Sequence, residues 1–87
     1  MENEVVVIAV GKDKPGLVAG VTTMISKLKG NIEEMDQVVL RDVFVMSLLI
    51  KFLDSENLRE PEELKEALIS QGEKIGLKVH IYPLKDL

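Results

Sequence analysis

The sequence predicts one α+β domain, residues 1–87, with the element order βαββαβ, and three observations support this prediction. Four segments carry apolar, mostly β-branched residues at the spacing of strands, and two segments carry them at the spacing of amphipathic helices. A glycine follows each helical pattern, where helices commonly end. Two split β-α-β units in this order form a four-stranded antiparallel sheet with two helices on one face.

Residues 4–10 are expected to form a strand that is buried on both sides. Alternate residues are apolar on both faces: Val5, Val7 and Ala9 on one, and Val6, Ile8 and Val10 on the other. A strand of this kind is typical of the centre of a sheet.

The segment 11–18, GKDKPGLV, is expected to turn the chain from this strand into the first helix. Gly11 can adopt backbone angles that other residues resist. Pro15 has a fixed φ and no N–H group, which suits the first helical position, so the predicted helix spans residues 15–29. Its core-facing stripe consists of Leu17, Val21, Met24, Ile25 and Leu28. Gly30 is the expected stop.

The first N–H groups of this helix, on Gly16, Leu17 and Val18, have no evident side-chain acceptor unless Asp13 folds back over them. One interpretation is a site for a small anion, such as the carboxylate of an amino acid, because free N–H groups at a helix start attract anions. The other is a tight turn whose N–H groups bond to water or to Asp13. The residues alone favour the turn, because helix starts are common and ligand sites are few.

Residues 31–40 are expected to form a second strand, whose imperfect alternation indicates a bulge near Met35 or an edge position. Arg41-Asp42 is a candidate two-residue hairpin turn. Residues 43–53 form the most strongly predicted strand, and most of its second face is apolar too. Its first face is continuous: Phe44, Met46, Leu48, Ile50 and Phe52.

The rest of the sequence predicts a polar loop at 54–60, a helix at 61–75 that ends before Gly76, and a last strand at 77–83. In the resulting ferredoxin-like sheet, the first and third strands are expected at the centre, because both are apolar on two faces.

The helices of such a fold cover only one face of the sheet. The other face is expected to present Val, Ala and Leu side chains of the central strands to water. An exposed apolar patch of that kind usually marks an interface. We therefore expect that the chain is not a monomer, and the sequence leaves open which partner covers the patch and by which geometry.

Composition excludes several classes of function. The chain has no cysteine, which removes disulfides, thiolate metal sites and thiol catalysis and fits a reducing cytoplasm. No apolar run approaches the roughly 20 residues that span a bilayer, and no signal-peptide pattern is present, so no membrane partner is expected. The net charge of −4 argues against nucleic acid, whose binding depends on Lys and Arg at phosphates.

Residues able to perform catalysis are few. His80 is the only histidine and has no neighbours at metal-ligand spacing. The adjacent pairs Glu33-Glu34 and Glu62-Glu63 point apart on a strand or helix, and so are interpreted as solvated charges. No enzymatic activity, no cofactor and no metal ion are expected.

Two motifs resemble those of the ACT domain family. The segment 11–18 is similar to the family's G-x-D-x-P-G-hydrophobic turn, and Gly30-Asn31-Ile32 resembles its entry to the second strand. Either motif alone is weak, but here both occur at the usual distance, within a βαββαβ order over residues 4–82. The chain looks most like the small stand-alone ACT proteins of bacteria and archaea, and like one half of the glycine-cleavage repressor.

The resemblance implies a regulatory module that senses an amino acid or a similar small metabolite, usually as a dimer with the ligand at the subunit interface. Carried over to this chain, the ligand-binding residues are Gly11, Asp13, Gly16, Leu17, Asn31 and Ile32. No enzyme or DNA-binding domain is attached here, so such a sensor is expected to act on a partner enzyme or regulator. The alternative is a dimerisation or protein-interaction module with no small-molecule ligand.

Overall fold

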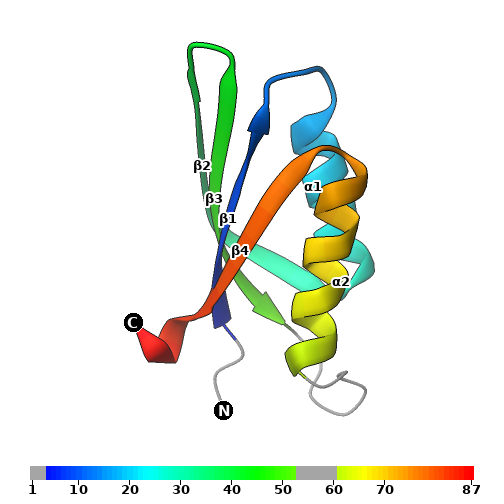
Figure 1. Cartoon of the computed structure of the whole chain (residues 1–87). Helices are drawn as coiled ribbons and strands as arrows, with labels where there is room; N and C mark the ends of the chain where they lie inside the picture. The colour runs from blue at the N-terminus through cyan, green and yellow to red at the C-terminus, as the bar shows by residue number, and fades with distance from the viewer. Residues whose placement is uncertain (1–3, 53–60) are drawn as a thin grey trace.

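The computed structural model describes residues 4–52 and 61–87, which form a four-stranded sheet with both helices on one side of it (Figure 1). The elements are β1 (Glu4–Lys12), α1 (Leu17–Lys27), β2 (Gly30–Leu40), β3 (Val43–Phe52), α2 (Pro61–Lys74), β4 (Leu77–Pro83) and a 3-10 turn, η1 (Leu84–Asp86). The predicted βαββαβ fold class is confirmed. The loop predicted at 54–60 lies outside the described residues.

The strand order is β2-β3-β1-β4, and all neighbouring strands are antiparallel. The strands predicted to be central, β1 and β3, are therefore central. Each has hydrogen-bonded neighbours on both edges, so their backbone groups are satisfied within the sheet. Val7 of β1, for example, lies opposite Leu48 of β3 and Ile81 of β4.

The core fills the space between the sheet and the helices. Among the residues whose side chains the structure describes, every buried side chain is apolar. The core members are Val7, Ala9, Leu17, Val21, Met24, Ile25, Phe44, Met46, Leu48, Ile50, Phe52, Leu68, Leu77, Val79 and Ile81. All the residues predicted for the first face of β3 belong to it. Ala9 does too, so the expectation that alanine shows on the open face was wrong: the pleat of β1 turns it toward the helices.

Helix α1 begins at Leu17 and not at the predicted Pro15. The residue between them, Gly16, is the N-cap and has a φ of +88°, a left-handed conformation that glycine adopts without steric cost. A right-handed helix cannot pass through such a residue, so Pro15 lies in the loop. The helix starts with the bond from the Gly20 N–H to the Gly16 carbonyl oxygen, over 2.9 Å.

The end of α1 also differs from the prediction. Lys29, with a φ of 67°, takes the left-handed position expected for Gly30, and Gly30 instead opens β2. A Cβ atom on Gly30 would lie 2.7 Å from Cγ2 of Ile25 and 3.0 Å from Cγ2 of Ile50. Glycine is required here because helix and strand approach closely, and not because it stops the helix.

Strand β2 is an edge strand, as predicted, and it contains a bulge. The register shifts between Ile32 and Glu34, slightly before the predicted position near Met35. The extra residue changes which side chains face the helices. As a result the polar residue Gln37 lies opposite Met46, on the same face of the sheet as the core.

The remaining elements follow the predictions closely. The turn Arg41-Asp42 joins β2 to β3, with Arg41 in the positive-φ conformation that two-residue hairpins require. Strand β1 continues into the predicted turn as far as Lys12. Helix α2 ends one residue before the predicted Ile75, and β4 has the predicted bounds.

We expect Gly11→Ala to lower the free energy of unfolding by about 1–3 kcal/mol, the usual cost of overpacking. A Cβ atom on Gly11 would lie 2.3 Å from the carbonyl oxygen of Gly76, a backbone atom at the α2–β4 turn that cannot move aside cheaply. Urea denaturation followed by circular dichroism measures the change.

The matched control is Gly20→Ala, inside α1. There the nearest atom is the flexible Cδ1 of Ile75, at 3.0 Å, and alanine is the better helix former. This variant should be as stable as the natural chain or more so. Equal denaturation midpoints for Gly11→Ala and the natural chain would contradict the predicted close packing.

Candidate functional site

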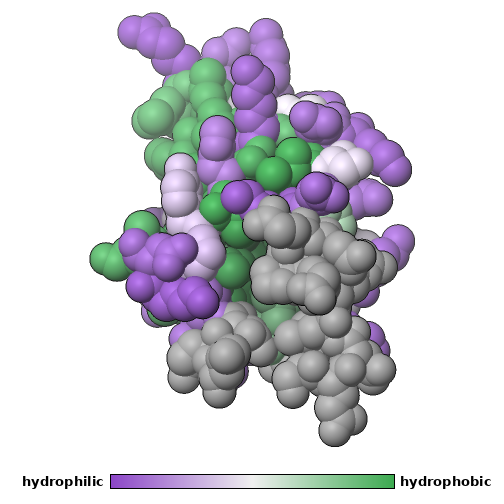
Figure 2. All heavy atoms as spheres, turned by 60° about the horizontal axis from the view of Figure 1, so that its bottom comes forward, coloured by the Kyte–Doolittle hydropathy of each residue, from purple (hydrophilic) through white to green (hydrophobic). Residues whose placement is uncertain are grey.

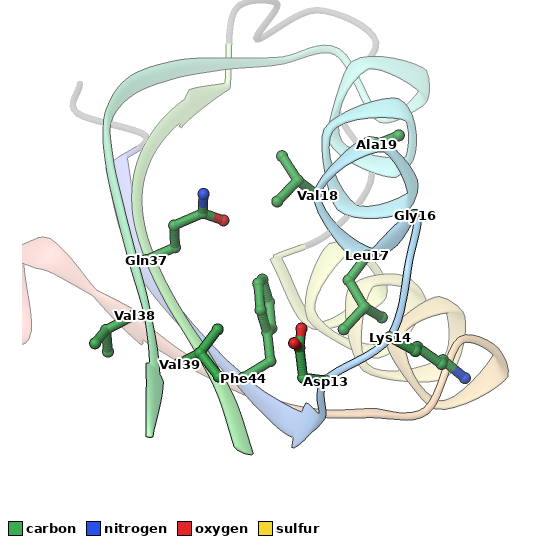
Figure 3. A pocket seen from close by; sticks show the side chains of 10 residues that line it. All are labelled: Asp13, Lys14, Gly16, Leu17, Val18, Ala19, Gln37, Val38, Val39 and Phe44. Atoms are coloured by element: carbon green, nitrogen blue, oxygen red, sulfur yellow. The ribbon is translucent and has the colours of Figure 1, made fainter. Parts of the chain in front are cut away.

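An open cavity of about 720 Å³ lies between the start of α1 and the second half of β2. Its lining comes from the β1–α1 loop, the first turn of α1, β2 and the start of β3 (Figure 3). The lining residues are Asp13, Lys14, Gly16, Leu17, Val18, Ala19, Gln37, Val38, Val39 and Phe44. Segments that are distant in sequence thus converge on one site.

The β1–α1 loop is held in place by the β2–β3 turn. The Asp13 N–H donates a hydrogen bond to the Asp42 carbonyl oxygen, over 2.8 Å. Lys12 and Asp42 also form an ion pair at 3.3 Å, but both side chains are largely exposed, so this pair contributes about 1 kcal/mol or less. The backbone bond is therefore the more important contact for fixing the position of Asp13.

The two charged side chains of the loop point in opposite directions. In Figure 3 the Asp13 carboxylate points into the cavity, beside Phe44 and Leu17, whereas the Lys14 side chain points away from it. Lys14 instead reaches toward Gly76, where an added Cβ atom would lie 3.0 Å from Nζ. In the described part of the chain, the Asp13 carboxylate has no hydrogen bond or ion pair, so it is available to a ligand cation.

The start of α1 brings main-chain donors to the cavity. No side chain caps the helix, and its first intrahelical bond begins only at Gly20. The N–H groups of Leu17, Val18 and Ala19 are therefore free of intrahelical partners, and all three residues line the cavity. A helix start of this kind favours a negatively charged group.

Apolar side chains make up most of the rest of the lining. Phe44 of β3 and Leu17 of α1 are buried, and they form the inner surface of the cavity. Val18 of α1 and Val39 of β2 point toward the space between helix and strand in Figure 3. The side chain of Val39 is 48% exposed, so this wall of the cavity is open to solvent.

Gln37 is the polar residue that sequence reasoning did not select. Its amide points across the cavity toward Val18 in Figure 3. A signal for it exists in the sequence: Gln37 interrupts an apolar series on the face of β2 that also carries Met35 and Val39. Reading that series requires the position of the bulge, because a shift of one residue moves Gln37 to the other face.

The structure brings together three of the predicted ligand-binding residues: Asp13, Gly16 and Leu17 line the cavity. Gly11 does not line it, and packs under the α2–β4 turn. Asn31 and Ile32 lie at the opposite end of β2, where they pair with Lys51 and Ile50 of β3. The Asn31 side-chain amide donates a hydrogen bond to Glu33.

Other candidate chemistry lies away from the cavity. His80 is exposed on the open face of the sheet, opposite Ile8. Within residues 4–52 and 61–87, no three acidic or histidine side chains are grouped so that they could hold a metal ion. None of the helices in that part of the chain has both the length and the apolar character needed to cross a bilayer.

Comparisons with known proteins agree with the fold. The model of the ACT domain family matches residues 3–82. A UPF0237 protein of Methanococcus maripaludis is 38% identical over 81 residues, which cover 93% of this chain and 87% of that relative.

Two solved structures share the fold. An ACT domain protein from Streptococcus pneumoniae superposes with a TM-score of 0.79 at 30% identity, over 92% of this chain and 88% of that one. A putative glycine cleavage system transcriptional repressor superposes with a TM-score of 0.78 at 21% identity, over 93% of this chain but 45% of its own. The second match agrees with the predicted likeness to one half of such a repressor.

The family match spans both sequence motifs and all four strands, and the relatives align over most of their own length. The fold and the two motifs predicted the same assignment. This chain therefore belongs to the ACT domain family, whose members are regulatory modules that bind small molecules.

Proposed function

We propose that this protein is a non-catalytic regulatory module that binds a free amino acid, or a similar zwitterionic metabolite, in the cavity between α1 and β2. The observation that carries the proposal is that one apolar-lined cavity contains both a group that attracts anions and a group that attracts cations. Free N–H groups at the start of α1 attract an anion, and the unpaired Asp13 carboxylate attracts a cation.

An α-amino acid satisfies both preferences at once. Its carboxylate accepts hydrogen bonds from the N–H groups of Leu17 and Val18, and its ammonium group donates to Asp13. An apolar side chain of the ligand packs against Phe44, and the Gln37 amide can donate or accept at its polar groups. A free amino acid fills only part of the 720 Å³, so water or a partner chain completes the site.

Binding without catalysis is supported by the chemistry of the lining. Its charged side chains are Asp13 and Lys14, and Lys14 points away. A single carboxylate without a second acid, base or nucleophile beside it provides no proton relay. The groups present serve to orient a ligand.

We further propose that the module works as a homodimer and acts on a separate enzyme or regulator. The same fold occurs as less than half of the putative repressor chain, so there it accompanies other parts of a larger protein. We expect the response to the ligand to pass through assembly with a partner. The edge strand β2, which lines the cavity, offers a surface for that purpose.

A screen of the common amino acids by thermal unfolding should identify one selective ligand class. At 100 times its dissociation constant, a ligand adds about 2.7 kcal/mol of stability, which raises the Tm of a domain of this size by roughly 10–20 °C. Calorimetry or circular dichroism is the suitable readout, because the chain has no Trp and one Tyr. A flat response to all compounds would contradict the proposal and favour the interaction module that binds no small molecule.

Asp13→Asn should weaken binding of the identified amino acid about 10- to 100-fold, because it removes a charge-assisted hydrogen bond worth roughly 1.5–3 kcal/mol. The stability of the unliganded protein should change little, because the Asp13 side chain is exposed and its backbone bond to Asp42 is retained. Isothermal titration calorimetry measures the affinity. Asp86→Asn, the same change at the exposed C-terminal turn, is the control and should bind normally. Equal affinities in the two variants would remove Asp13 from the site.

A further inference from the structure

One polar side chain, that of Gln37, interrupts an apolar row on the side of β2 that faces the cavity. Gln37 pairs with Met46 of β3, whose side chain is fully buried, so both residues lie on the inner face of the sheet. The neighbours of Gln37 on this face, Met35 and Val39, are apolar. Gln37 is therefore the residue of β2 that brings a hydrogen-bonding side chain to the cavity.

The carboxylates next to Gln37 along β2 point to the opposite side. Glu34 and Asp36 lie opposite Leu49 and Ser47 of β3, on the outer side of the sheet, away from the helices. On that side, hydrophobic side chains reach the surface on the left of Figure 2. The cavity thus receives an uncharged amide from β2 and neither of these negative charges.

The side-chain amide of Gln37 is available to a ligand. In the described part of the chain it has no hydrogen-bond partner, whereas the Gln37 backbone N–H donates to the Asp36 carboxylate over 2.9 Å. The amide points across the cavity toward Val18 in Figure 3. A ligand that packs against this amide removes water from it, and must then replace the lost hydrogen bonds or bind less tightly.

Gln37 and Asp13 line the same cavity at different levels along the strands. The Asp13 N–H is bonded to Asp42, whereas Gln37 pairs with Met46, four residues later in the chain. Four residues of extended chain cover roughly 13 Å. A ligand whose ammonium group is bound by Asp13 therefore reaches Gln37 only with the far end of a long side chain.

We propose that Gln37 determines the specificity of this site, and that it selects amino acids with a long, uncharged side chain that ends in a hydrogen-bonding group. This inference rests on the proposed function and narrows its ligand class. L-glutamine is the best match among the common amino acids. Its amide both donates to and accepts from the amide of Gln37, while its methylene groups pack against Phe44 and Val18.

Other side chains fit the site less well. A short one, such as that of serine, does not reach Gln37. An aliphatic one covers the amide without bonding to it, and a site built to form hydrogen bonds rejects a ligand that lacks them. A charged one meets no free opposite charge in the lining, because Lys14 points away and Asp13 binds the ligand's ammonium group.

The full chain should bind L-glutamine at least about 10-fold more tightly than three close analogues, as measured by isothermal titration calorimetry. L-asparagine is one methylene group shorter, L-glutamate has the same shape with a charge, and L-methionine has similar length without the amide. If one of these binds as tightly as glutamine, the inference is wrong but the proposed function stands, because an amino acid still binds. If no amino acid binds, both are wrong.

Gln37→Met should reverse this preference, because it removes the amide but keeps an unbranched side chain of similar length. We expect L-glutamine to bind about 10-fold more weakly than to the natural chain, and L-methionine to bind as well or better. Gln37 is exposed, so the variant should fold normally. Gln71→Met, the same change at an exposed position on α2, is the control and should retain the preference for glutamine.

A purely structural role of Gln37 would give a different result. Gln37→Met would then weaken both ligands by the same factor, as we expect of Asp13→Asn, which acts on the ammonium group that all amino acids share. Equal losses for glutamine and methionine in Gln37→Met, or no loss for either, would overturn the inference.

Discussion

The antiparallel pairing of β1 with β3 is the constraint on which the rest of the structure depends. The pairing runs without interruption from Glu4 opposite Lys51 to Lys12 opposite Val43. Since Lys12 ends β1 where β3 begins, this register places the β1–α1 loop directly beside the β2–β3 turn. The hydrogen bond from the Asp13 N–H to Asp42 follows from that placement, and it fixes the mouth of the cavity. The cavity is therefore a consequence of strand register and not of the loop motif alone.

The sequence predicted the elements and their order because hydrophobic spacing reflects the geometry of sheets and helices directly. The prediction of helix boundaries failed where two neighbouring residues were equally suitable, because tertiary packing then determined which of them was used. A proline and a glycine near the start of α1 each offered a boundary, and the left-handed Gly16 was used. At the other end, Gly30 was needed for contact with Ile25, so Lys29 took the strained backbone position.

The same distinction explains what was predicted of the candidate site. Asp13, Gly16 and Leu17 are close in sequence, so a local motif was enough to place them together. Gln37 reaches the cavity because the bulge in β2 sets which of its side chains face the helices. No local pattern determines that face, because a shift of one residue exchanges the two sides of a strand. The polar half of the lining on β2 was therefore visible only in the folded chain.

Strand β2 separates the cavity from the outer side of the sheet. Gln37 and Val39 face the cavity, whereas Asp36 and Val38 face the outer side of the sheet. A ligand can change assembly only to the extent that it binds monomer and dimer with different affinity, and the dimer must then change ligand affinity by the same factor. Because β2 is an edge strand with one neighbour, its position can be biased more easily than that of the central strands β1 and β3. Coupling between ligand binding and assembly therefore has its most direct physical path through β2, which lines the cavity and forms an edge of the sheet.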